Sequence, residues 1–201
     1  MQFQLSRRSF RNFTGLVFSI LALAVVSHAQ EAASQKNSTV TIKNFGQMDD
    51  RFYRGARPKE QEYQELAALG IKTVIDLTAD PKPYEKTAVE ALGMTYINIP
   101  MVEKAYPTVE ATKMFLKLAG DPNTGKFFVH CAGGRHRTGA MGAVYRQKFY
   151  NWNFDQVYAE MKKYDFYTSG GHGAFKDFVK DYYAKMLADK EANASKAEQK
   201  Q

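Results

Sequence analysis

The chain has 201 residues, of which 44% are hydrophobic, and a formal net charge of +7. This length suits one domain with terminal extras. Three of the positive charges belong to Arg7, Arg8 and Arg11, so a chain without its first 29 residues carries about +4. That charge is mild, and the basic and aromatic residues form no extended stripe, so nucleic acid is not an expected partner.

Residues 1–29 have the pattern of a secretory signal peptide. A basic start precedes an apolar run over residues 16–26, too short for a comfortable membrane span, and Ser27-His28-Ala29 follows as a small-x-small cleavage pattern. The run Ser-Arg-Arg-Ser-Phe at residues 6–10 resembles a bacterial twin-arginine signal. We therefore expect an exported protein, periplasmic or secreted, whose mature chain has no stable membrane span. An uncleaved anchor is the alternative.

Strand-like and helix-like segments alternate along the rest of the chain. Residues 30–46 are small and polar and indicate a linker, with a weak candidate edge strand at 39–42. The apolar patterns predict strands at 51–54, 71–77, 94–101 and 127–129. They predict helices at 58–69, 107–120, 154–164 and 173–187, one more helix that ends at about residue 92, and another that starts at residue 138. Residues 188–201 predict a disordered tail. This rhythm predicts an α/β domain over residues 47–187, with a largely parallel central sheet flanked by helices.

The only cysteine, Cys131, lies in the loop between a predicted strand and a predicted helix. A loop that leads into a helix N-terminus directs backbone N–H groups at one place, which favours an anion there. Gly133 and Gly134 permit unusual backbone angles, and Arg137 supplies a planar, two-pronged donor that matches phosphate. The same field lowers the pKa of a thiol, to roughly 3.5–7.5 in known cases. A nucleophile and an anion-binding cradle therefore share one loop.

An inert thiol is the alternative interpretation of Cys131, because a lone cysteine in apolar surroundings is usually a small core residue. The chain offers no second cysteine for a disulfide. In an exported protein, where disulfides are common, a single retained thiol favours a chemical role.

The run His-Cys-Ala-Gly-Gly-Arg-His-Arg-Thr-Gly over residues 130–139 resembles the phosphate loop of cysteine-dependent protein tyrosine and dual-specificity phosphatases, His-Cys-x5-Arg-[Ser/Thr]. Its basic second half is most similar to the atypical dual-specificity branch, some of whose members act on inositol phosphates or phosphoinositides. Residues 52–55 and 69–77 also resemble the opening of that domain, so the resemblance covers about residues 50–187. It implies a fold of the dual-specificity phosphatase type and no cofactor. We expect no metal either, because the histidines show no ligand spacing.

The resemblance also implies roles for the residues of this loop. The Cys131 thiolate would attack phosphorus and form a phosphocysteine, which water then hydrolyses. Thr138 would hydrogen-bond the thiolate, and His130 would brace the loop. The transferring oxygens would be held by the loop amides and by Arg137, which assigns phosphate binding to Ala132, Gly133, Gly134, Arg135, His136 and Arg137.

The general acid is the position where the sequence departs from the family. The family usually supplies an Asp to protonate the leaving oxygen, whereas this chain has Glu103 at the aligned place. Glu103 is the first candidate, Asp80 the second and Glu110 the third. Each has an ordinary interpretation as a solvated or turn-forming carboxylate.

Two substrate classes stay open: a phosphotyrosine or other phosphoprotein, and an inositol phosphate or phosphoinositide. Arg135 and His136 suggest a site more cationic than phosphotyrosine needs, with Lys82, Lys86 and Lys104 as possible rim residues. A non-catalytic phosphate-binding module on the same fold is the main alternative function. A rhodanese-type sulfurtransferase is a weaker one, because its loop typically has a shorter interval between Cys and Arg. We expect a monomer.

Overall fold

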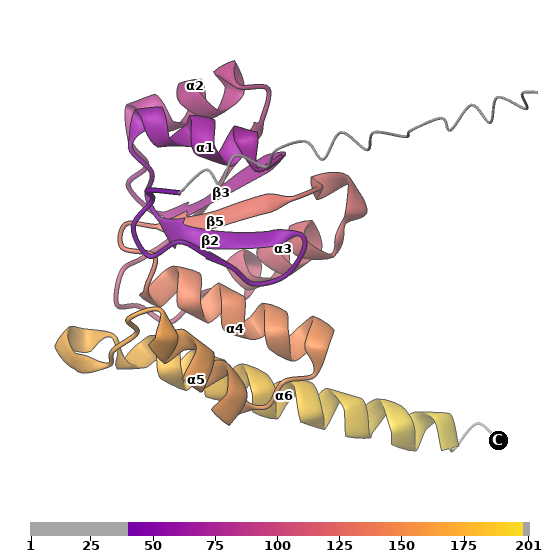
Figure 1. Ribbon diagram of the computed structural model, residues 1–201. Coiled ribbons are helices and arrows are strands. Elements are labelled where there is room, and N and C mark those ends of the chain that lie inside the picture. The colour runs from indigo at the N-terminus through magenta and orange to yellow at the C-terminus, as the bar shows by residue number, and fades with distance from the viewer. Residues whose placement is uncertain (1–39, 199–201) are drawn as a thin grey trace, which may run out of the picture. The chain divides into compact units, whose positions relative to one another are not determined.

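The computed structural model describes residues 40–198 (Figure 1). These residues form a five-stranded sheet in the order β1-β2-β5-β3-β4. The strands β2, β5, β3 and β4 are parallel, and β1 pairs antiparallel to β2. The strands are β1 (Gly46–Gln47), β2 (Phe52–Ala56), β3 (Thr73–Thr78), β4 (Thr95–Met101) and β5 (Phe127–Cys131). The predicted α/β fold with a largely parallel sheet is confirmed.

Helices cover both faces of this sheet (Figure 1). The helices α1 and α2 lie on one face, and α3, α4, α5 and α6 lie on the other. Short 3-10 turns precede α1, follow α3 and precede α6. The helices are α1 (Tyr63–Ala68), α2 (Pro83–Ala91), α3 (Val109–Gly120), α4 (His136–Tyr150), α5 (Phe154–Lys163) and α6 (Gly173–Glu198).

The strand β5 joins the two cores because its side chains alternate between the faces of the sheet. Phe127, Val129 and Cys131 belong to the larger core beneath α4, whereas Phe128 belongs to the smaller core beneath α1 and α2. All five residues of β5 are buried. The continuous apolar run that predicted this strand is thus explained by helices on both of its sides.

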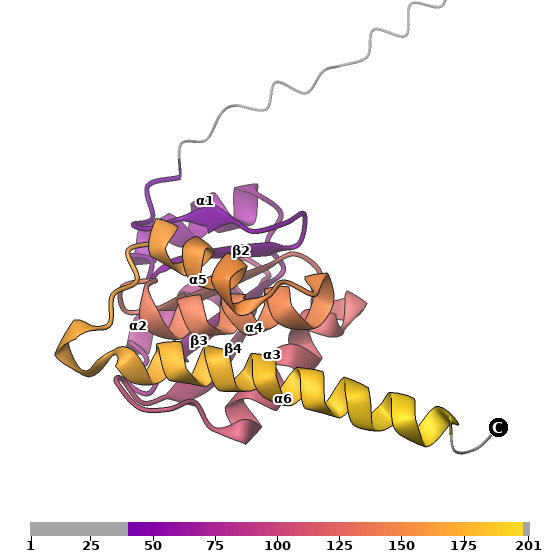
Figure 2. The ribbon, with the colours of Figure 1, turned by 90° about the horizontal axis from the view of Figure 1, so that it is seen from below.

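The helix α4 begins within the predicted phosphate loop, at His136, and is buried on nearly every side. Every residue from His136 to Gln147 is buried. The reason is visible in Figure 2, where α5 and α6 lie against the side of α4 that faces away from the sheet. A helix enclosed by a sheet and two helices needs no polar face over that length.

The ends of the domain differ from the sequence-based expectations. No strand forms over residues 40–42; the edge strand is β1, at Gly46–Gln47, and residue 39 lies outside the described residues. Residues 40–46 are part of the domain rather than linker, because Ile42 is buried in the core with Tyr53 and Phe128. The predicted signal at 1–29 and the linker up to residue 39 also lie outside the described residues.

At the other end, helix replaces the predicted tail. The helix α6 continues to Glu198, well past residue 188. This segment is rich in Ala, Lys and Glu, which have high helix propensity. Lys185 pairs with Asp189 one turn away, at 2.9 Å, which adds a little more support. High polarity was therefore a poor guide to disorder here.

Candidate active site

The candidate nucleophile lies at the carboxyl end of the central strand. Cys131 is the last residue of β5, and α4 begins five residues later at His136. The parallel strands β2 and β3 flank β5 on its two sides. Ligands of open parallel sheets bind at such an edge. The loop over residues 131–137 is therefore placed where an anion can meet both the strand end and the helix N-terminus.

Gly134 is required by the path of this loop. Its φ is +66°, a left-handed conformation that other residues adopt only with strain. A Cβ at this position would lie 2.4 Å from the carbonyl carbon of Gly55, a residue of the neighbouring strand β2. The loop and β2 therefore approach each other at a distance that only glycine allows.

Two side chains from outside the loop hold its backbone in this shape. Asn44 donates from Nδ2 to the carbonyl oxygen of Gly134 at 3.0 Å and to that of Tyr164 at 3.1 Å. Arg54, which is fully buried on β2, also donates to the Gly134 carbonyl and lies over the Tyr164 ring at 3.9 Å. Because these donors face the loop carbonyls from outside, the loop N–H groups are left to face Cys131. Neither residue was identified from the sequence.

The thiol of Cys131 is acidified by its surroundings. Burial alone would raise its pKa, but Thr138, the charge of Arg137 and the Gly134 N–H lower the pKa overall. Cys131 is 3% exposed, and Thr138 is fully buried beside it. The structure thus brings Cys131, Thr138 and Arg137 together as the sequence predicted, and the thiolate is the form that the loop favours.

Arg137 is fixed from the side of β4. It is a buried residue of the first turn of α4, and its Nη1 donates to the backbone carbonyl of Met101 at 3.2 Å. The guanidinium keeps further N–H groups for a ligand, since it carries five in all. A planar, positioned fork beside a thiolate is suited to hold two oxygens of a phosphoryl group.

His130 lies beneath the loop, not in the pocket. Its ring is fully buried, with Nε2 3.3 Å from Oε2 of Glu85 and Nδ1 3.8 Å from Oδ1 of Asp76. Burial lowers the pKa of His130 to about 4, although Asp76 acts in the opposite direction. The neutral ring therefore occupies a polar position under β5, which fits the predicted bracing role. Glu85 itself is held by Arg57, whose Nε lies 2.9 Å from Oε1.

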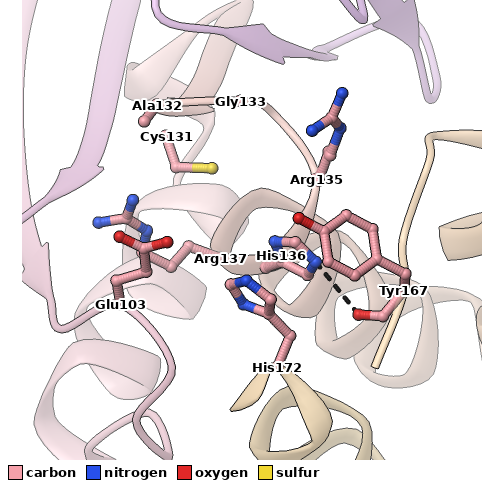
Figure 3. Close-up of a pocket in the computed structure, with 9 residues that line it drawn as sticks. All are labelled: Glu103, Cys131, Ala132, Gly133, Arg135, His136, Arg137, Tyr167 and His172. Carbon is pink, nitrogen blue, oxygen red and sulfur yellow. Dashed lines mark hydrogen bonds between the residues drawn. The ribbon is translucent and has the colours of Figure 1, made fainter. Parts of the chain in front are cut away.

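A cavity of about 110 Å³ opens above Cys131 (Figure 3). Of the predicted phosphate-binding residues, all but Gly134 line this cavity. The full lining is Glu103, Cys131, Ala132, Gly133, Arg135, His136, Arg137, Tyr167 and His172. The cavity therefore joins the loop to residues from two other parts of the chain, the segment after β4 and the segment before α6.

Of the three candidate acids, only Glu103 lines this cavity. Figure 3 shows its carboxylate on the wall beside Arg137. Asp80 is exposed and lies 3.9 Å from Arg57, and Glu110 is an exposed residue in the first turn of α3. A general acid must come within hydrogen-bond reach of the leaving oxygen, so the geometry favours Glu103.

Two of the residues that line the cavity are stacked histidines. The rings of His136 and His172 are parallel within 3°, with centroids 3.6 Å apart, and His136 Nε2 lies 3.1 Å from the Tyr167 carbonyl. Burial and the neighbouring His172 lower the pKa of His136 to about 4. His136 is therefore neutral near pH 7, and the expectation that it adds positive charge to the site was wrong. Arg135 and Arg137 carry that charge.

His172 and Tyr167 were not identified from the sequence. They lie more than thirty residues after Cys131 and carry no motif of their own; Ser169–Gly171 between them is a 3-10 turn. Only the packing of α6 against α4 brings them to the cavity. The sole hint in the sequence was the Gly-rich break before α6.

A buried, acidified cysteine under an arginine fork, at the end of a parallel strand, is the active-site plan of cysteine-dependent phosphatases. Residues 19–181 match the family model described as DSP-PTPase phosphatase fused to NAD+ kinase, and the chain belongs to this family. It is a cysteine-dependent phosphatase. This result sets aside the sulfurtransferase and the non-catalytic module.

Curated relatives agree with this class, and a solved structure agrees with the fold. The chain is 28% identical over 126 residues to "Putative tyrosine-protein phosphatase OCA1" of Mycosarcoma maydis, covering 60% of this chain and 79% of that protein. It is 27% identical over 125 residues to inositol diphosphatase DSP3 of Arabidopsis thaliana, covering 60% and 61%. The core catalytic domain of the S. cerevisiae PP-IP phosphatase SIW14 has a similar fold, with a TM-score of 0.63 at 21% identity over 75% of this chain and 94% of that one.

Proposed function

We propose that this phosphatase acts on inositol phosphates that carry several phosphate groups. The observation that carries the proposal is the second arginine of the cavity lining, Arg135, whose Nε lies 3.8 Å from Oδ2 of Asp165. One arginine is enough to hold the phosphoryl group that is transferred. A second cation at the mouth favours a substrate with a further anionic group. Relatives named inositol diphosphatase support the same class.

The first chemical step transfers the phosphoryl group to sulfur. The Cys131 thiolate attacks phosphorus, the S–P bond forms and the P–O bond to the leaving group breaks. Glu103, in its protonated form, gives a proton to the leaving oxygen. The loop N–H groups and Arg137 hold the three non-bridging oxygens throughout the transfer.

The second step regenerates the enzyme. Water attacks phosphorus and gives a proton to the Glu103 carboxylate, the S–P bond breaks, and inorganic phosphate leaves. The Thr138 hydroxyl, which helps to lower the pKa of Cys131, stabilises the departing thiolate. Glu103 is thus protonated again for the next cycle.

The test compares kcat/KM for an inositol polyphosphate and for a phosphotyrosine peptide. Arg135→Ala is expected to lower kcat/KM for the polyphosphate more than for the peptide, and added salt is expected to narrow the gap, because exposed charges are screened. Lys117→Ala, which removes an exposed cation from α3, is the control and should leave kcat/KM unchanged for both substrates. Equal effects of Arg135→Ala on both substrates would contradict the proposal.

Phosphotyrosine is the second candidate substrate, because an aromatic side chain lines the cavity. Tyr167 is 44% exposed and faces the cavity across from Glu103 (Figure 3). A flat substrate ring could stack on it, as aromatic pairs prefer. A higher kcat/KM for the peptide, reduced by Tyr167→Ala but not by Arg135→Ala, would favour this class instead.

We propose further that the chain is exported and acts as a monomer, with residues 1–29 removed. The support is the twin-arginine pattern and the small-x-small site. None of the helices within residues 40–198 combines the length and the apolar character needed to cross a membrane. Cell fractionation with N-terminal sequencing tests export, and sedimentation of the mature chain tests its oligomeric state. Arg7→Lys with Arg8→Lys should block export if the twin-arginine route is used.

A further inference from the structure

We propose that His172 forms a second anion-binding position beside the catalytic loop, which takes a further phosphate group of the substrate. The inference rests on the proposed class of substrate, multiply phosphorylated inositols, and names the residue that would recognise the second group. It starts from the place of His172 on the cavity wall between Glu103 and His136 (Figure 3).

The His172 ring is enclosed, yet its hydrogen-bonding capacity is not used. The residue is 5% exposed, and its Nδ1 is buried without a hydrogen-bond partner. Buried polar side-chain atoms in native proteins are nearly always paired. His136, stacked on it, differs in this respect, because its Nε2 lies 3.1 Å from the Tyr167 carbonyl. Of the two stacked imidazoles, His136 is therefore paired with the backbone, whereas His172 Nδ1 has no partner within the described residues.

The position of His172 in the chain also favours an anion. It directly precedes Gly173, the first residue of the 26-residue helix α6. The N-terminus of a long helix carries partial positive charge, which adds to that of a protonated imidazole. Lys104 is close by, since a Cβ at Gly171 would lie 3.4 Å from the Lys104 side chain.

The surroundings of His172 disfavour the protonated form of its ring in the free protein. Burial lowers the pKa of His172 in the free protein, Lys104 and Arg137 lower it further, and Glu103 acts in the opposite direction. Tyr167 and His136 pack against the ring. A second phosphate beside the ring would favour the imidazolium and raise this pKa. Binding of a two-phosphate ligand should therefore take up a proton and become tighter as the pH falls.

The experiment measures the affinity of the mature protein for methylenediphosphonate, a stand-in for two adjacent phosphates, and for inorganic phosphate by calorimetry between pH 5.5 and 8. The ratio of these two affinities measures what the second anion-binding position adds to binding. We expect the affinity for methylenediphosphonate to exceed that for phosphate about tenfold or more at low pH, and this ratio to shrink toward pH 8. The free energy of one hydrogen bond to a charged group corresponds to an affinity change of this size. His172→Phe keeps an aromatic ring on His136 but no ring nitrogen, and should remove most of the ratio.

Lys117→Ala, on the outside of α3, is the matched control and should leave the ratio and its pH dependence as in the wild type. A ratio that survives His172→Phe overturns the proposal, and so does an equal loss of affinity for both ligands, which would mean a purely structural role. If His172→Phe does not fold, His172→Gln keeps a neutral donor, and a pH dependence unchanged in that variant overturns the proposal.

These binding measurements need no turnover, so they are separate from the test of the substrate. If inositol polyphosphates are not hydrolysed but the ratio still depends on His172, the proposed substrate class is wrong. The second anion-binding position is supported in that case.

Discussion

His130 Nε2 lies 3.3 Å from Oε2 of Glu85, and both residues are fully buried. Glu85 belongs to α2, on the face of the sheet opposite to α4. The residue that precedes the nucleophile is thus held from one side of the sheet, while the nucleophile itself faces the other side. This arrangement couples the small core beneath α2 to the position of the catalytic loop.

The burial of His130 predicts a loss of stability in acid. Its pKa is about 4 in the folded protein against 6.5 in the unfolded chain. The contribution of the neutral His130 ring to the free energy of unfolding is therefore complete above pH 6.5. It is lost as the pH falls toward 4, because the unfolded chain then binds a proton that the folded protein does not. This contribution amounts to about 3 kcal/mol. Glu85 acts in the opposite direction, since burial raises its pKa.

Urea unfolding from pH 7.5 to 4.5 measures this effect, with His130→Asn as the comparison that removes the titrating ring. The unfolding free energy of the wild type should fall more steeply with acid than that of the variant. Parallel curves for the two proteins would show that His130 is not buried as a neutral ring.

Cys131→Ser should abolish turnover and preserve anion binding. The loop N–H groups and Arg137 form the cradle, and neither is changed by replacing sulfur with oxygen. Vanadate or phosphate binding, followed by calorimetry, should therefore stay near the wild-type affinity while hydrolysis of para-nitrophenyl phosphate disappears. Turnover near the wild-type rate would rule out the phosphocysteine intermediate.

Glu103→Gln should separate substrates by their leaving groups. An alkyl oxygen needs a proton to leave, whereas nitrophenolate leaves readily without one. General acid catalysis contributes about 10²–10⁴-fold, so kcat for an inositol ester should fall by a factor in that range and kcat for para-nitrophenyl phosphate far less. Small and equal losses on both substrates would remove Glu103 from the mechanism, and Asp80→Asn would be tested next.

Gly134→Ala should damage both folding and activity. The new Cβ would lie 2.4 Å from backbone atoms of β2, in a residue whose φ is +66°. Gly70→Ala is the matched control, because Gly70 has φ +79° but open space around it. We expect about 1–2 kcal/mol of destabilisation for Gly70→Ala and a much larger loss, with little activity, for Gly134→Ala. Similar melting temperatures for the two variants would contradict the close contact between the loop and β2.

The sequence by itself determined the catalytic loop and the order of the elements. Cys131, Thr138 and Arg137 lie within eight residues, so a strand end, a turn and a helix start are enough to bring them together. A central sheet flanked by helices could also be anticipated, because strand-like and helix-like apolar patterns alternate along the chain. Local chemistry and local backbone geometry account for both successes.

The tertiary structure decided which distant side chains complete the site. Arg54 reaches the loop because β2 pairs beside β5, and Asn44 reaches it from the segment before β1. His172 reaches the cavity because α6 packs along α4. The same packing removes the charge of His136, a residue that looks cationic in the sequence, because burial disfavours its protonated form. Such contacts and such pKa values depend on neighbours that are remote in the chain, and no spacing within a single segment records them.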